Sequence, residues 1–360
     1  VHNSSAVIER ILQVVSTPMT LAGQKVEITC SLGCAHYPSD GSDGSTLLKH
    51  ADVAMYRAKD SGRNSIQHYD QKAERDEGEQ LLIKQALKEA IENNQFTLNY
   101  QIQAELDQGL ISGMEALLRW RHPQLGMVPP ARFIPIAEQS DQIKSITEWV
   151  MRETCRQIKR WRQQGLKTVP VAVNISGRLL KDPTWLEQLV SRCLEESGLG
   201  TDSLELEITE SASMGDPDSI IPLLSRLKEW GLKLAIDDFG TGYSNMSYLK
   251  RFPVDKLKID GSFIREITSE PRSLAIADAI INMAHQLNLK VVAEMAETPG
   301  QVRMLSHRGC DQVQGYFFAK PLPASDCIPL LTDGKMVLPE EPRAQAPRSL
   351  LILDDEAKVL

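Results

Sequence analysis

Long apolar runs, paired cysteines and an excess of basic residues are all missing from this chain of 360 residues. No segment approaches the roughly 18 consecutive apolar residues that indicate a membrane-spanning helix. The formal net charge is −8, so we expect no surface that grips a nucleic-acid polymer, although a local basic site is compatible with it. The hydrophobic fraction of 42% and the charged fraction of 24% are those of an ordinary soluble globular protein.

Cysteine is spread thinly and never forms a CxxC pair. We therefore expect reduced, mostly buried thiols, as in a cytoplasmic protein. The histidines have no metal-like spacing either. The first residues contain neither an initiating Met nor a signal-peptide pattern, so we expect the sequence to be an excised piece. The six cysteines are Cys30, Cys34, Cys155, Cys193, Cys310 and Cys327.

The first 80 residues have a pattern of their own. Within residues 1–70 we expect a helix near 6–15, one strand in 25–38, and an amphipathic helix that Gly62 ends. The polar stretch 71–80 is expected to be a linker, either a joint or the start of a connecting helix.

Residues 81–323 alternate short apolar strands with amphipathic helices. About 240 residues of such units indicate a parallel sheet, and this length fits a closed, TIM-like (β/α)8 barrel of the α/β class. An open doubly wound sheet is the alternative, but no glycine-rich dinucleotide fingerprint follows a first strand. The expected strands read FTLNYQ, LISGMEALLRW, VAVNIS, LELEIT, KLAIDDF, KLKID, VVAEMA and DQVQG.

The end of the chain differs again. Residues 324–348 contain four prolines and are expected to form a linker. Residues 349–360 begin with SLLILDDE, a short apolar strand followed by acids.

Polar side chains occupy one face of several expected strands. In LELEIT, Glu205 and Glu207 share a face because strand side chains alternate. Asn174, Lys258 and Glu294 lie likewise on the polar faces of their strands. In a barrel this face points inward, and active sites lie at the C-terminal strand ends. We therefore expect these side chains to converge.

Taken singly, each of these residues has a plainer explanation. A lone strand glutamate such as Glu205 is more often solvated or salt-bridged, and Asn174 could cap a helix. Arg119 beside Trp120 could be a surface cation–aromatic contact. So many coincidences within one barrel favour a single site.

The acids at the strand ends outnumber the bases that oppose them. Crowded carboxylates cannot all ionise without a counter-charge. Oxygen ligands and a neutral amide suit Mg²⁺ or Mn²⁺ better than zinc, and two such ions sharing a carboxylate fit phosphoester hydrolysis. The acids are Glu115, Glu207, Glu210, Asp237, Asp238, Glu294 and Glu297, and the bases are Arg119 and Lys258.

These residues lie in motifs that resemble, in order and spacing, the EAL family of cyclic di-GMP phosphodiesterases. The resemblance implies an EAL-type barrel over 81–323 and metal-dependent hydrolysis of cyclic di-GMP to linear pGpG. It also implies a homodimer formed through the barrel. The motifs are EALLRW at 115–120, NIS at 174–176, EITES at 207–211, DDFGTGYSN at 237–245, KID at 258–260, AEMAET at 293–298 and QGYFFAKPLP at 314–323.

The resemblance implies roles for individual residues and two Mg²⁺ or Mn²⁺ ions per site. Asp237 would bridge the two ions and Asp238 would hold the second. Lys258 and Glu294 match the pair that positions and deprotonates the attacking water, with Glu294 as the general base. The ligands of the first ion would be Glu115, Asn174, Glu207 and Asp237. The substrate-binding residues would be Gln101, Leu118, Arg119 and Gln314. The residues that anchor or shape the loop after DDFG would be Glu210, Gly240, Gly242 and Glu297.

Met295 departs from the family pattern, because a glycine usually follows the catalytic glutamate. In a regular strand Met295 would face away from Glu294. If the glycine serves a bend, Glu294 would be displaced and the reaction slowed. The alternative function is therefore a catalytically weak or inactive EAL domain that acts as a cyclic di-GMP receptor or interaction platform. The intact metal-ligand positions favour the enzyme.

Both ends resemble parts of other signalling domains. The stretch from ITCSLG to SIQHY within 1–70 resembles the C-terminal half of a GGDEF domain, an α+β fold. The GG(D/E)EF signature itself is absent from the sequence, so we expect no diguanylate cyclase activity. The terminal SLLILDDE resembles the first strand and acidic pair of a response-regulator receiver domain.

Overall fold

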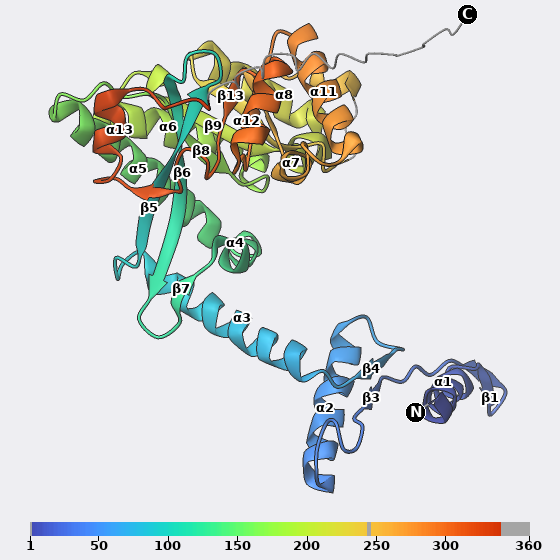
Figure 1. Cartoon of the computed structure of the whole chain (residues 1–360). Coiled ribbons are helices and arrows are strands. Elements are labelled where there is room, and N and C mark those ends of the chain that lie inside the picture. The colour runs from blue at the N-terminus through green and yellow to red at the C-terminus, as the bar shows by residue number, and fades with distance from the viewer. Residues whose placement is uncertain (1, 243–245, 340–360) are drawn as a thin grey trace, which may run out of the picture. The chain divides into compact units, whose positions relative to one another are not determined.

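The computed structural model describes residues 2–242 and 246–339, and its contacts divide the chain into two compact units (Figure 1). The units are Val1–Gln85 and Ala86–Leu360, and helix α3 (Gln71–Ala90) contains the boundary between them. The stretch 71–80 is thus helical. The segment expected to begin a receiver domain, 349–360, lies outside the described residues. No helix in the described part of the chain is long and apolar enough to cross a membrane.

The described part of the first unit contains helices α1 and α2, most of α3, and two small sheets. Helix α2 begins where the Asp43 side chain accepts a hydrogen bond from the Thr46 backbone N–H. The single strand expected in 25–38 is wrong, because this segment divides between β2 and β3, which pair in separate sheets. β1 and β2 are antiparallel, whereas β3 and β4 are parallel. The elements are α1 (His2–Val15), β1 (Met19–Leu21), β2 (Gln24–Val26), β3 (Leu32–Cys34), α2 (Gly44–Asp60) and β4 (Ile66–His68).

The second unit contains a closed barrel, as the sequence predicts. Around the barrel the strands follow the order β5, β13, β12, β11, β10, β9, β8, β6, and β6 pairs again with β5. Each of the eight strand segments expected from the sequence supplies one of these strands. Their bounds are β5 (Phe96–Glu105), β6 (Ile111–His122), β8 (Val171–Ile175), β9 (Leu204–Thr209), β10 (Lys233–Phe239), β11 (Lys256–Ile259), β12 (Lys290–Ala293) and β13 (Gln312–Val313).

Strand β5 departs from the expected parallel sheet. It is antiparallel to both of its barrel neighbours, β6 and β13, whereas the other neighbouring barrel strands are parallel. The reason is the short connection 106–110, since parallel neighbours need a crossover of about a dozen residues or more. The long β5–β6 hairpin also extends beyond the barrel, where β7 (Gly126–Val128) pairs with β6 (Figure 1).

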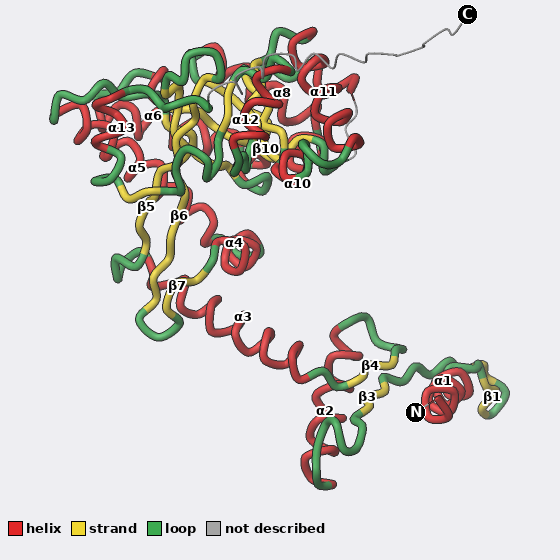
Figure 2. The backbone as a smooth tube through the Cα atoms, viewed as in Figure 1, coloured by secondary structure: helices red, strands yellow, loops and turns green. Residues whose placement is uncertain are grey.

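Helices surround the barrel strands (Figure 2). Helix α5 shows why they pack there: Ile143, Ile146, Val150 and Ile158 recur at helical spacing and are buried. The helices after α3 are α4 (Pro130–Glu138), α5 (Gln142–Gln163), α6 (Pro183–Ser197), α7 (Glu210–Gly215), α8 (Pro217–Glu229), α9 (Met246–Leu249), α10 (Gly261–Arg265), α11 (Pro271–Gln286), α12 (Pro299–His307) and α13 (Ile328–Asp333).

The expected linker 324–348 begins with ordered structure that packs on the barrel unit. Helix α13 has Pro329 in its first turn, where proline is tolerated, and ends at Gly334, whose φ is 65°. Leu331 is buried, and the Gly334 carbonyl accepts a hydrogen bond from the Ile111 N–H. Pro329 therefore begins a helix instead of marking a linker. After α13, only residues up to 339 are described.

The inside of the barrel carries the polar side chains. Along β9, Leu206 and Ile208 are buried on one face, and Glu205 and Glu207 are equally buried on the other. Both faces are thus covered, one by helices and one by the barrel interior. The carboxylates are buried at the point where neighbouring strands bring their own polar residues.

Candidate functional site

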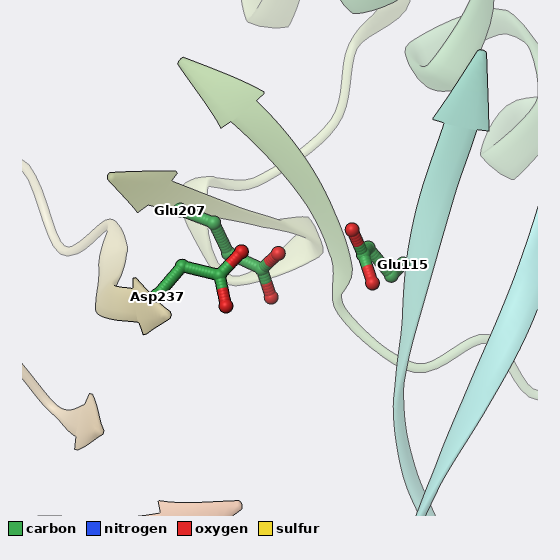
Figure 3. A group of neighbouring side chains, drawn as sticks. All are labelled: Glu115, Glu207 and Asp237. Carbon is green, nitrogen blue, oxygen red and sulfur yellow. The ribbon is translucent and has the colours of Figure 1, made fainter. Parts of the chain in front are cut away.

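Lys258 lies at the centre of a buried acidic cluster. Its side chain is fully buried on β11, and its Nζ lies 2.8 Å from Glu207 Oε2, 2.8 Å from Glu294 Oε1 and 3.1 Å from Asp237 Oδ1. Glu115 Oε2 is 3.7 Å away. Figure 3 shows Glu115, Glu207 and Asp237 reaching toward one space from three strands. The structure therefore brings together residues predicted from five separate motifs.

The charges of the cluster shift its pKa values. Burial alone would lower the pKa of Lys258, but the surrounding carboxylates raise it well above its ordinary value. Burial raises the pKa of Glu207 well above the usual range, and it raises that of Glu294 to about 8 although Lys258 opposes both shifts. Burial and the charge of Asp237 raise the pKa of Asp238. One ammonium therefore cannot satisfy all of these acids.

Glu115 differs from its neighbours because hydrogen bonds hold its carboxylate. Oε1 accepts from Asn174 Nδ2 at 2.6 Å, and Oε2 accepts from Gln314 Nε2 at 2.6 Å. Burial alone would raise the pKa of Glu115, but Lys258 and these two amides keep it below the ordinary value. Glu115 is thus ionised and fixed in orientation.

A bulge explains how two consecutive aspartates reach the same site. The register between β10 and β11 shifts between Ile236 and Phe239, and Asp238 adopts a φ of 56°. In a regular strand Asp237 and Asp238 would face opposite sides. Here they form one group with Glu294, with candidate ligand atoms within 4.8 Å of one another.

The cluster has the donor set of a site for two divalent cations. Glu115, Glu207 and Asp237 form one group of oxygen ligands, and Asp237 joins Asp238 and Glu294 in a second, each within 4.8 Å. Asp237 belongs to both groups. Glu207 Oε1 is buried and has no hydrogen-bond partner, which is unusual for a buried carboxylate. A hard cation such as Mg²⁺ or Mn²⁺ would satisfy this oxygen.

A cavity of about 280 Å³ opens beside the cluster. Arg119 is half-buried in its wall, where burial lowers the pKa of the guanidinium. Leu118 does not line this cavity: it faces an apolar pocket of about 400 Å³ beside α4 and α5, whereas the neighbouring Leu117 lines both. The cavity is lined by Gln101, Glu115, Leu117, Arg119, Asp237, Glu294, Met295, Glu297, Gln314, Gly315, Tyr316 and Pro321.

Five lining residues were not predicted as site residues from the sequence: Leu117, Met295, Gly315, Tyr316 and Pro321. Alternation along β6 puts Leu117 on the same face as Glu115 and Arg119, and this signal could have identified it. Tyr316 follows the end of β13, where alternation gives no information. Met295 was expected to face away from Glu294 only in a regular strand, and the strand is not regular here. β12 ends at Ala293, and Met295 adopts a φ of 56°, so the alternation stops before it.

The loop after β10 is tied to a buried glutamate. Glu210 Oε2 accepts hydrogen bonds from the Gly240 N–H at 2.8 Å and the Gly242 N–H at 3.3 Å. Gly240 has a φ of 102°, and a Cβ there would lie 2.7 Å from a ring carbon of Phe263. The loop therefore requires glycine at this point. Residues 243–245 lie outside the described part. Glu297, by contrast, is exposed, and its backbone N–H donates to Gln301 Oε1.

Family models match both units of the chain. The EAL domain model matches residues 84–321, and the model "Diguanylate cyclase, GGDEF domain" matches residues 1–65. The cyclic di-GMP phosphodiesterase NbdA of Pseudomonas aeruginosa is 41% identical over 322 residues, 89% of this chain and 41% of NbdA. The bifunctional diguanylate cyclase/cyclic di-GMP phosphodiesterase MucR of the same species is 38% identical over 326 residues, 91% of this chain and 47% of MucR. The chain spans less than half of these relatives.

Solved structures show the same barrel. The structure titled "PaMucR Phosphodiesterase, c-di-GMP complex" is 40% identical, with a TM-score of 0.65, and the match covers 68% of this chain and 99% of that one. The enzyme Bd1971, in a form with cAMP and cyclic di-GMP bound, is 31% identical with a TM-score of 0.67, over 81% of this chain and 77% of that one. The chain thus belongs to the EAL domain family.

Proposed function

We propose that this chain hydrolyses cyclic di-GMP to linear pGpG with two divalent cations, Mg²⁺ or Mn²⁺. The observation that supports it most is the pair of acidic groups that share Asp237 beside the unpartnered Glu207 Oε1. Relatives named as cyclic di-GMP phosphodiesterases, including NbdA and PdeR of Escherichia coli, support the choice of substrate. The first ion would take Glu115, Asn174, Glu207 and Asp237, and the second Asp237 and Asp238.

The residues around the ions have complementary tasks in this proposal. Bound cations would neutralise the phosphate charge and lower the pKa of a bound water. Glu294, whose carboxyl group lines the cavity beside the cluster, would accept a proton from that water as the general base. Lys258 holds Glu294 in place at 2.8 Å. Arg119 lines the cavity and would bind a phosphate oxygen, and Gln101 and Gln314 line the same cavity.

A cyclic di-GMP receptor with little or no turnover is the second candidate. Its support is Met295, whose left-handed backbone conformation follows Glu294 directly. Residues other than Gly, Asn and Asp rarely adopt this conformation, so the position of Glu294 depends on a strained neighbour.

Incubation of the purified protein with cyclic di-GMP and Mg²⁺ or Mn²⁺, followed by chromatography, distinguishes the two functions. We expect pGpG to appear, and Glu115→Ala and Glu294→Ala to abolish it. Glu229→Gln, an exposed acid on α8, is the matched control and should hydrolyse normally. Tight nucleotide binding without product from the unmodified protein would favour the receptor.

Further parts of the proposal concern the whole protein. We propose that residues 1–70 are the C-terminal half of a GGDEF domain, that 81–323 form the phosphodiesterase barrel, and that 349–360 begin a receiver domain. We also propose a homodimer through the barrel, which sedimentation equilibrium would show as a doubled mass. A cytoplasmic location is supported by six cysteines that are all free thiols.

A further inference from the structure

A second buried Lys–Glu pair lies one layer below the proposed site. Lys256 Nζ is 2.9 Å from Glu205 Oε2, and both side chains are at least 94% buried. The two residues stand two positions before Lys258 and Glu207 on the same strands, so they face the same barrel interior. Neither lines the cavity beside the site, and the proposed reaction uses neither.

Gln103 connects this lower pair to the site. The Gln103 side chain is 1% exposed, and its Oε1 accepts a hydrogen bond from Lys256 Nζ at 3.3 Å. Its Nε2 donates to Gln314 Oε1 at 3.0 Å. Gln314 Nε2 in turn donates to Glu115 Oε2 at 2.6 Å and to Gln101 Oε1 at 3.2 Å. A continuous chain of hydrogen bonds therefore runs from Lys256 to Glu115.

The ends of this chain fix its direction. A lysine ammonium only donates hydrogen bonds, so Gln103 must present its carbonyl oxygen to Lys256. The amide nitrogen of Gln103 then faces Gln314, which must accept with its own oxygen. That leaves the amide nitrogen of Gln314 for Glu115, which as a carboxylate only accepts. Each side-chain amide in the chain has one orientation that satisfies all its partners.

We propose that Gln103, held by Lys256 and Glu205, is a positioning residue that fixes the Glu115 carboxylate through Gln314. Without the Gln103 amide, Gln314 can turn and set its oxygen against Glu115, two acceptors face to face. The carboxylate would then shift, and cation binding would weaken. This inference rests on the proposed function only in taking Glu115 as a cation ligand.

Strand β6 leaves room for this arrangement at Gly113. A Cβ added to Gly113 would lie 2.8 Å from Gln103 Oε1, closer than a side chain tolerates. An alanine there would displace the Gln103 amide without deleting a polar group. Gly113→Ala therefore perturbs the same link by a second route.

The test is a Mn²⁺ titration of the purified protein, with free Mn²⁺ measured by electron paramagnetic resonance. Gln103→Met keeps the side-chain length and removes both hydrogen bonds. We expect about tenfold weaker Mn²⁺ binding, the range typical when a partner of a metal ligand is lost. Gly113→Ala should weaken binding in the same direction. At saturating Mn²⁺, the KM for cyclic di-GMP should change less than twofold.

Gln312→Met is the matched control. Gln312 is 3% exposed on the neighbouring β13, and its Oε1 has no hydrogen-bond partner. This variant should bind Mn²⁺ as the unmodified protein does. Unchanged Mn²⁺ affinity in both Gln103→Met and Gly113→Ala, with folding verified by thermal unfolding, would overturn the inference. So would an unmodified protein that binds no Mn²⁺.

The double variant Gln103→Met/Gln314→Met tests the route. If Gln103 acts through Gln314, the double variant should bind Mn²⁺ no more weakly than Gln314→Met alone. Losses that multiply would show an independent effect and contradict the route. Mn²⁺ binding without cyclic di-GMP hydrolysis in the unmodified protein would refute the proposed function and leave this test intact.

Discussion

Buried acids around a single ammonium govern the chemistry of individual residues in this site. Lys258 contacts Glu207, Glu294 and Asp237 within 3.1 Å, yet burial still raises the pKa of Glu207 and Glu294. Protons or divalent cations must supply the missing positive charge. Binding of cations should therefore release protons, and pH should alter the stability of the metal-free protein.

We expect the free energy of unfolding of the metal-free protein to fall as pH rises from about 5 to about 8. The pKa of Glu294 is raised from 4.5 to about 8, so over this range the folded protein keeps a proton that the unfolded chain has released. Urea unfolding in the presence of a chelator measures the slope. Glu294→Gln should flatten it, and Mn²⁺ should reverse it. A stability that rises toward pH 8 without metal would contradict the prediction.

Met295 and Gly261 should be energetically coupled. A Cβ added to Gly261 would lie 2.7 Å from Met295 Cβ and 2.2 Å from Met295 Sδ. Gly261→Ala should therefore cost about 1–3 kcal/mol of stability, as overpacking does. In a Met295→Gly background, Gly261→Ala should lower the free energy of unfolding by at least about 1 kcal/mol less than it does in the unmodified protein, because the clash is gone. Denaturant unfolding of the four proteins gives the coupling, and simple additivity would contradict it.

Single residues could be predicted where strands stay regular. Period-two alternation placed Glu207 and Lys258 together correctly, since β9 and β11 have no irregularity there. It did not apply at Met295, because the strand ends before that residue. It also could not explain how the consecutive residues Asp237 and Asp238 reach the same site. A bulge and a left-handed backbone depend on tertiary packing, which a pattern of residue types does not encode.

At the scale of elements, the loop after β10 depends on one buried acid. Glu210 accepts the Gly240 and Gly242 N–H groups, which join the loop to the end of β9. Because Asp237 and Asp238 directly precede this loop, its position controls theirs.

Glu210→Ala should therefore lower turnover by about 10- to 100-fold through weaker cation binding, as losses near metal ligands do. Hydrogen exchange at the amides of residues 240 and 242 should accelerate in the same variant. Ser211→Ala, on the exposed next residue of α7, is the control and should leave both measurements unchanged. Slow exchange with full activity in Glu210→Ala would show that the loop needs no such anchor.

Element types were predicted better than their connections. All eight barrel strands were located, because apolar runs bounded by turns mark them well. The antiparallel β5 was missed although its hairpin is short. Helix α13 was also missed, because composition alone does not distinguish a proline in the first turn of a helix, such as Pro329, from a proline in a linker.

At the scale of the whole molecule, the barrel gathers residues from distant motifs into one acidic centre. The family match and the fold were predictable from many short motifs in fixed order. The contacts that hold Glu115, through Gln314 and Gln103, depend on side-chain packing across the barrel and were not predictable.

The most direct test of the central claim is a crystal structure of the protein soaked in Mn²⁺, with the ions located by anomalous scattering. We expect two ions, one on either side of the Asp237 carboxylate, the first also contacting Glu207 and Asn174 and the second contacting Asp238. Asp237 without any ion, or a single ion far from Glu207 Oε1, would contradict it.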